Sequence, residues 1–174
     1  YLAFGGIWGG QLDKWKTGTF DPNGGEPADE ENAVCCKIAR MSGDLLEFAE
    51  KPRDIVVLDE NGNQLKAKHR DQRFFEGPWI HKYNGTYYFS YSTGDTHQLV
   101  YATADNPYGP YTWRGVILTP VLGWTTHHSI VEFQGEWFLF YHDCELSGGI
   151  NHKRNVKFAR LQYRDDGSIV TINP

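Results

Sequence analysis

The chain has 174 residues, of which 40% are hydrophobic and 22% are charged, and its formal net charge is −5. This length is enough for one core of ordinary size, and the composition is ordinary for a globular protein. The acidic balance and the lack of a basic stripe argue against nucleic acid or an anionic membrane as partners, and no apolar stretch approaches the length of a membrane span.

Helical periodicity is nearly absent, and strand-like segments follow one another in three sets. The first set consists of Tyr1–Phe4, Cys35–Met41 and Ile55–Leu58. The second set consists of Trp79–Tyr83, Tyr87–Ser92, Leu99–Thr103 and Tyr111–Val116. The third set consists of His128–Phe133, Trp137–Tyr141, Val156–Tyr163 and Ile169–Ile172. Together with an aromatic content of 15% and 19 glycines, this pattern predicts an all-β fold.

The second and third sets resemble each other at an offset of roughly 50 residues, because Asn84-Gly85 and Gln134-Gly135 stand at equivalent hairpin turns. Four-stranded repeats of this period are typical of β-propeller blades. We therefore predict about three blades, with approximate boundaries at 1–70, 71–122 and 123–174. A closed propeller needs at least about four blades. The sequence also begins, at Tyr1, in what reads as the middle of a strand. We expect the missing blades to come from a longer parent protein or from another chain.

The cysteines Cys35, Cys36 and Cys144 follow neither a disulfide pattern nor a zinc-ligand spacing. We expect mostly free thiols. The compartment stays undetermined.

Glu76 is the residue with the strongest chemical signal. It stands in the run Phe74-Phe75-Glu76-Gly77-Pro78-Trp79, between large apolar side chains and a Gly-Pro turn that leads into a strand. Removal from water disfavours the charged form of a carboxyl group and favours the neutral form. A carboxylic acid that keeps its proton near neutral pH can donate it to a leaving-group oxygen. The alternative is a glutamate on the rim of the fold with no chemical role.

Four segments together resemble glycoside hydrolase family 43. These are Phe75-Glu76-Gly77-Pro78-Trp79-Ile80, Asn84-Gly85-Thr86-Tyr87-Tyr88, His127-His128-Ser129-Ile130-Val131-Glu132 and Phe140-Tyr141-His142-Asp143. The run Ser147-Gly148-Gly149, followed by Lys153-Arg154-Asn155-Val156-Lys157, is similar to the β-xylosidase and α-L-arabinofuranosidase branches. The resemblance covers nearly the whole chain. It implies a five-bladed β-propeller that cleaves glycosidic bonds with inversion.

Inversion uses one carboxyl group as acid and a second as base, set far enough apart to admit a water molecule. The resemblance places Glu76 at the position of the general acid. It also implies a general-base aspartate and a third aspartate that modulates the pKa of the acid, both upstream of Tyr1. Asp13 and Asp21 follow the first strand, which is the wrong order. We therefore expect the isolated chain to be inactive and the intact parent to be active.

The same resemblance assigns substrate binding to His127 and Arg154. Trp79 is a further candidate for lining the cleft, with Trp8 and Trp124, although packing inside a blade is the more common position of a tryptophan. Strand alternation allows only one of His127 and His128 to face the pocket, and we expect a structural role for His128. No cofactor is required, but a calcium ion in the central channel could contact His127 through water.

The resemblance favours β-1,4-xylosides and α-L-arabinofuranosides of hemicellulose as substrates, so the expected ligands are xylo- or arabino-oligosaccharides. Two alternatives stay open. One is a propeller that binds carbohydrate without catalysis, which would explain both the aromatic residues and the incomplete set of carboxylates. The other is a propeller fragment that assembles with copies of itself through its open strand edges.

Overall fold

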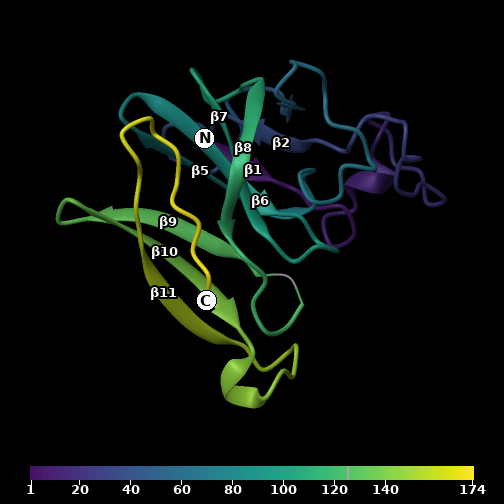
Figure 1. Ribbon diagram of the computed structural model, residues 1–174. Coiled ribbons are helices and arrows are strands. Elements are labelled where there is room, and N and C mark those ends of the chain that lie inside the picture. Colours follow the sequence, from purple (N-terminus) through teal and green to yellow (C-terminus); the bar gives the residue numbers. More distant parts are fainter. Residues whose placement is uncertain (125) are drawn as a thin grey trace.

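The computed structural model describes residues 1–124 and 126–174 and confirms the all-β class. Three sheets contain all the named strands, and the described residues form no α-helix (Figure 1). The first sheet is antiparallel and consists of β1 (Leu2–Phe4), β2 (Cys36–Ala39) and β3 (Arg53–Ile55). Two short 3-10 helices, η1 (Leu12–Lys14) and η2 (Glu145–Ser147), lie in loops.

The second sheet has five strands in the order β4-β8-β7-β6-β5. Its members are β4 (Val57–Leu58), β5 (Glu76–Tyr83), β6 (Thr86–Ser92), β7 (Leu99–Ala104) and β8 (Tyr111–Leu118). The segment 55–58, which we expected as one strand of the first set, is divided between two sheets. Ile55 pairs with Cys36 in the first sheet, whereas Val57 pairs in parallel with Tyr111 of β8.

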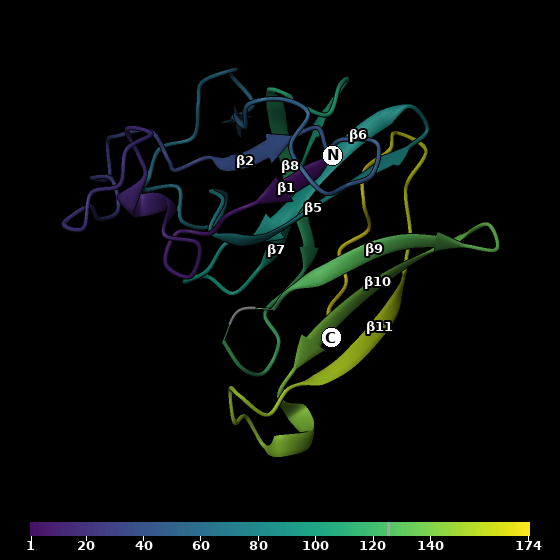
Figure 2. The ribbon, with the colours of Figure 1, turned by 180° about the vertical axis from the view of Figure 1, so that it is seen from behind.

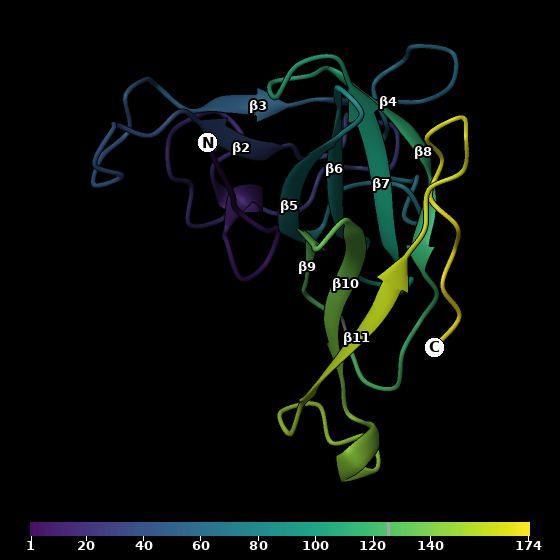
Figure 3. The same ribbon diagram turned by 90° about the vertical axis from the view of Figure 1, so that its left-hand side faces the viewer.

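The third sheet consists of β9 (His128–Phe133), β10 (Glu136–Asp143) and β11 (Asn155–Leu161). The expected fourth strand, 169–172, is reduced to two isolated bridges. Ile169 bridges to Tyr163, and Ile172 bridges in parallel to Leu118 at the end of β8. The C-terminal segment therefore returns from the third sheet to the second, and it runs beside β8 in Figure 3.

Both predicted hairpin turns are present. Asn84 and Gly85 have φ values of 45° and 86°, and Gln134 and Gly135 have values of 54° and 81°. Positive φ at both central residues is the signature of the type I′ turn, whose twist matches that of the flanking strands. The turns fix the registers of β5 with β6 and of β9 with β10, so the two hairpins are structural equivalents.

Two apolar clusters hold the sheets together. One joins the first and second sheets and includes Ile38, Ile55 and Phe89, while the other joins the second and third sheets and includes Ile117 and Leu139. One edge strand of each sheet contacts an edge strand of the next sheet, β1 with β5 and β5 with β9, and these strands lie side by side in Figure 2. This packing is what successive propeller blades require. The number of blades in the whole protein stays a prediction.

Several large apolar side chains are exposed on one face of the third sheet. We call this the outer face, and it comprises Val131, Phe133, Phe140, Val156 and Phe158. The exposed fractions of Phe133 and Phe158 are 62% and 67%. Apolar patches of this kind are typical of surfaces that contact another surface.

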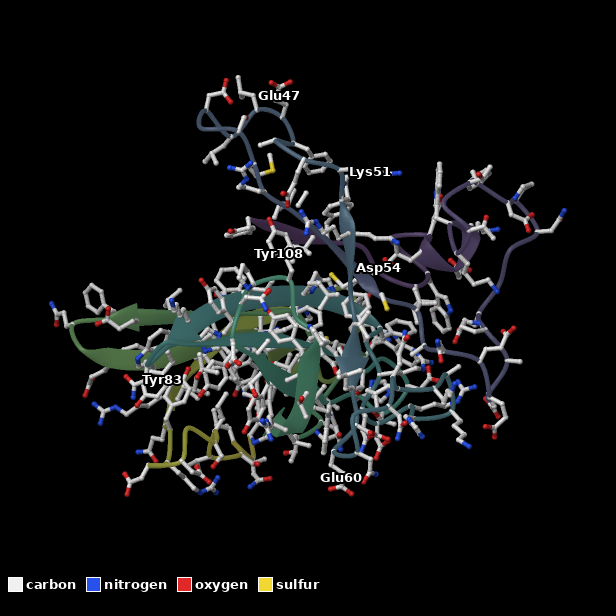
Figure 4. The ribbon with its side chains drawn as sticks, turned by 90° about the horizontal axis from the view of Figure 1, so that it is seen from above. Glu47, Lys51, Asp54, Glu60, Tyr83 and Tyr108 are labelled. Atoms are coloured by element: carbon white, nitrogen blue, oxygen red, sulfur yellow. The ribbon has the colours of Figure 1, made fainter. Side chains whose placement is uncertain are left out.

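At the far side of the molecule, the loop that carries Glu47 and Lys51 projects from the sheets (Figure 4). The Glu50 carboxylate anchors this loop by accepting a hydrogen bond from the Tyr108 hydroxyl at 2.6 Å. Within residues 1–124 and 126–174, no helix has the length and apolar character needed to cross a membrane.

Candidate active site

One strand from each of the three sheets ends or begins at a cavity of about 340 Å³. Its lining comes from the end of β1, the start of β5 and the segment that enters β9, and consists of Ala3, Phe4, Gly5, Gly6, Gly9, Gly10, Glu76, Gly77, Pro78, His127 and His128. Five of these residues are glycines, so much of the wall is bare backbone. Such a wall leaves room for a ligand and offers peptide groups as hydrogen-bond partners.

A larger cavity of about 630 Å³ lies at the opposite ends of the strands, between the Asn84-Gly85 turn and the segment 165–168. It contains exposed aspartates, and two of the three tyrosines on its wall have hydroxyls that are already bonded: that of Tyr88 donates to the Gly167 carbonyl and that of Tyr101 accepts the Ile169 N–H. We therefore assign the candidate chemistry to the smaller cavity, which contains Glu76.

Glu76 begins β5, where the strand carries a bulge. Glu76 pairs with Ser92 and Trp79 with Ser90, so Gly77 and Pro78 form the irregular step between them. Gly77 has φ of 65°, a left-handed conformation that glycine adopts without strain. A bulge of this kind turns a side chain out of the regular alternation. The Glu76 side chain is 21% exposed, as expected for a partly desolvated carboxyl group at the mouth of a pocket.

The two consecutive histidines point to different places. His127 Nε2 lies 3.6 Å from Glu76 Oε1, and the His127 side chain is 54% exposed. His128 Nε2 lies 2.7 Å from the Ser90 hydroxyl, and its Nδ1 is buried. Burial, helped by the neighbouring charges of His81 and His127, lowers the pKa of His128 to about 3. His128 is therefore a neutral structural residue, as expected, and His127 is the histidine beside the carboxyl group.

His142, for which the sequence suggested no role, links His127 to Arg154. Its Nε2 accepts the backbone N–H of His127 at 3.0 Å and lies 3.5 Å from Arg154 Nη1. The Nε group of Arg154 also donates to the Asn151 carbonyl at 3.0 Å. The structure therefore places Arg154 next to His142, which binds the backbone of His127, whereas only His127 of the two predicted binding residues lines the cavity with Glu76.

Trp79 occupies a packing position. Its indole N–H donates to the Ile130 carbonyl at 3.0 Å, and its ring packs into the cluster between the second and third sheets. Trp79 is absent from the described lining of the cavity, so the prediction that it binds substrate gains no support from the geometry. The other two candidates are exposed. The ring centroids of Trp8 and Trp124 are 6.3 Å apart, and Trp8 packs edge-on against Phe75, the residue before Glu76.

Glu76 is the only carboxylate among the described residues that line the cavity. Asp13 is buried and Asp21 is exposed, and neither lines the cavity. Calcium takes six to eight oxygen ligands. The described part of the chain contains no group of three or more His, Cys, Asp or Glu residues arranged to hold a metal ion. A contact from His127 to calcium through water therefore stays a prediction.

Comparison with known proteins identifies the family. Residues 22–169 match the model of the glycosyl hydrolases family 43. The chain belongs to this family.

Two curated relatives each share more than half of the aligned residues with this chain. The chain is 57% identical over 172 residues to a xylosidase/arabinosidase of Bacteroides ovatus, and 53% identical over 172 residues to a β-xylosidase of Xylanibacter ruminicola. The alignments cover 99% of this chain but only 53% and 54% of those proteins. The chain therefore spans about half the length of the curated relatives it matches.

Solved structures agree closely with the fold. A family GH43_1 enzyme from Xanthomonas citri superposes with a TM-score of 0.97 at 51% identity, over 99% of this chain and 52% of that one. A β-xylosidase/α-arabinofuranosidase from a compost metagenome, solved with xylotriose in a calcium-free form, gives a TM-score of 0.95 at 56% identity, over 98% of this chain and 53% of that one.

Proposed function

We propose that the protein containing this chain hydrolyses β-1,4-xylosides and α-L-arabinofuranosides of plant hemicellulose, and that Glu76 is the general acid. The observation that carries the proposal is the position of Glu76: a partly desolvated carboxyl group at the converging ends of the sheets, 3.6 Å from His127. Relatives named xylosidase or arabinosidase, with 53% to 57% identity, support the substrate class.

The reaction is inverting in this proposal. Glu76 protonates the departing glycosidic oxygen, while a second carboxylate removes a proton from the attacking water on the other face of the sugar ring. That base and the third carboxylate, which modulates the pKa of the acid, belong to the part of the protein outside these 174 residues. The single carboxylate among the described lining residues and the half-length match to relatives both support this division.

His127 and Arg154 bind the sugar in the cavity. An arginine can donate two parallel hydrogen bonds to neighbouring hydroxyls, and an imidazole can donate or accept one. The outer face of the third sheet docks the remaining blades, which come from the parent protein or from another chain. The 174 residues alone then hydrolyse nothing, because the acid has no base to act with.

The test is the anomeric form of the first product. The full-length protein is incubated with an aryl β-D-xyloside and an aryl α-L-arabinofuranoside, and the released sugar is followed by NMR before it mutarotates. We expect turnover of both substrates and α-xylose as the first product of the xyloside. Release of β-xylose would contradict inversion. Sugar binding without turnover would favour the carbohydrate-binding alternative instead.

A further inference from the structure

The ladder between β9 and β10 ends at the pair Tyr141 and His128. In the same register, the next position would place His142 opposite His127. At that position, side-chain hydrogen bonds take the place of the backbone bonds of the ladder. The buried Thr126 hydroxyl donates to the His142 carbonyl at 2.6 Å and accepts the His142 N–H at 3.0 Å. The Thr126 side chain thus binds the backbone of His142 where a backbone group of β9 would otherwise do so.

The His142 imidazole completes this local arrangement. Its Nε2 accepts the His127 N–H at 3.0 Å, which requires an unprotonated Nε2 and a proton on Nδ1. Burial, and after it the positive charge of Arg154, lowers the pKa of His142 below its ordinary value and keeps the ring neutral. The nitrogen that the bond needs is therefore available as an acceptor at neutral pH.

The bond holds the backbone that carries the His127 ring. With its N–H bound to His142, the His127 ring lies 3.6 Å from Glu76 Oε1 and against Gly77, where an added Cβ would approach His127 Cδ2 to 3.2 Å. The ring centroids of His127 and His142 are 6.2 Å apart, so the two rings are near neighbours. A freed His127 backbone could rotate the ring away from the carboxyl group.

We propose that His142 is a positioning residue: through its Nε2 it fixes the backbone of His127 beside Glu76, with the Arg154 guanidinium as its neighbour. The inference rests on the proposed function, because it assigns His142 to the site in which Glu76 acts. His142 is absent from the described lining of the cavity, so in this proposal it acts through His127.

Three substitutions in the full-length protein separate positioning from simple packing. His142→Gln places an amide oxygen as many bonds from Cβ as Nε2 is, so it keeps an acceptor in place. His142→Asn places its oxygen one bond too short, and His142→Phe keeps the ring but has no acceptor. We expect the Phe and Asn variants to lose about 10- to 100-fold in kcat, with a smaller change in KM, because misplacement by about 1 Å costs this much.

The Gln variant should recover most of that loss, while all three variants and the exposed control His152→Gln melt within a few degrees of the wild type. Equal kcat in the Phe variant and the wild type would overturn the proposal. Equal losses in folded Gln and Phe variants would also overturn it, since the acceptor would then not matter.

A second measurement does not depend on turnover. The hydrogen bond predicts a through-bond NMR coupling between the His127 amide nitrogen and His142 Nε2 in the full-length protein. A visible coupling supports the positioning role even if no substrate is hydrolysed, in which case only the proposed function fails. A spectrum that shows Nε2 protonated at neutral pH would contradict the positioning role, whatever the activity.

Discussion

Gly77 and His127 are in contact across the candidate site: a Cβ at residue 77 would lie 3.2 Å from His127 Cδ2 and 3.3 Å from Cγ. Gly77 also has φ of 65°, in the region that favours glycine. Two independent requirements therefore meet at one residue. The backbone bulge that orients Glu76 needs a left-handed residue, and the histidine beside Glu76 needs the space that a side chain would fill.

Gly77→Ala should therefore lower both stability and activity. The left-handed conformation costs a residue with Cβ about 1 to 2 kcal/mol, and the added methyl group pushes the His127 ring. We expect kcat/KM to fall by at least about tenfold. Gly85→Ala is the matched control, because Gly85 has φ of 86° but faces open space. Thermal melting should show similar losses in both variants, and only the first should lose activity. Equal activity in the two would count against a role for this contact.

Local sequence signals predicted the hairpins but not the pairing of distant segments. Asn84-Gly85 and Gln134-Gly135 each specify their own turn, because few residue pairs accept positive φ at both positions. By contrast, the pairing of Val57 with Tyr111 joins segments far apart in the chain, and the residues themselves carry no signal for it. The division of the expected strand 55–58 follows from that long-range pairing.

The site shows the same difference between local and distant signals. Glu76 was predicted from its neighbours in sequence and His127 from the resemblance to the family, whereas His142 was overlooked. A signal was present, since counting outward in equal steps from the Gln134-Gly135 turn places His142 opposite His127. Trp79 was predicted to bind substrate, and the structure places it in a packing position instead. A tryptophan suits both a sugar cleft and a core, and only the packing between β5 and β9 decides its position.

Acid should destabilise the protein partly through His81. Its Nε2 lies 2.7 Å from the Tyr163 hydroxyl, its Nδ1 is buried, and burial lowers its pKa from 6.5 to about 4. The rings of Tyr88, Trp137 and Tyr163 surround it and carry no charge at acid pH. Between about pH 4 and pH 6.5, the His81 side chain binds a proton in the unfolded chain but not in the folded chain. The free energy of unfolding therefore falls as the pH is lowered through this window, by at most about 1.4 kcal/mol per pH unit for this group.

Urea denaturation of the full-length protein between about pH 7.5 and about pH 4.5 measures this dependence. His81→Gln should flatten the curve, even though the substitution also lowers stability at every pH. The exposed control His152→Gln should leave the slope unchanged. An identical slope in His81→Gln and the wild type would show that His81 does not titrate in this window.

The outer face of the third sheet should make the isolated chain associate. Phe158 and Val156 lie two residues apart on this face of β11 and are 67% and 79% exposed. Apolar surface that is exposed to water favours contact with another surface. Phe158→Glu should shift the isolated 174 residues toward the monomer in sedimentation experiments. Leu146→Glu is the control, because Leu146 is 86% exposed in η2, outside this face. A wild-type chain that stays monomeric at high concentration would argue against a docking role for the face.

The most direct test of the account compares leaving groups in the Glu76→Gln variant of the full-length protein. A general acid accelerates the departure of a basic leaving group by about 10²- to 10⁴-fold, whereas a leaving group that is already a stable anion needs no proton. We predict that Glu76→Gln loses most of its activity on xylobiose but little on an aryl xyloside with a strongly acidic phenol. The same fractional loss on both substrates, or none on xylobiose, would contradict the assignment of Glu76 as the proton donor.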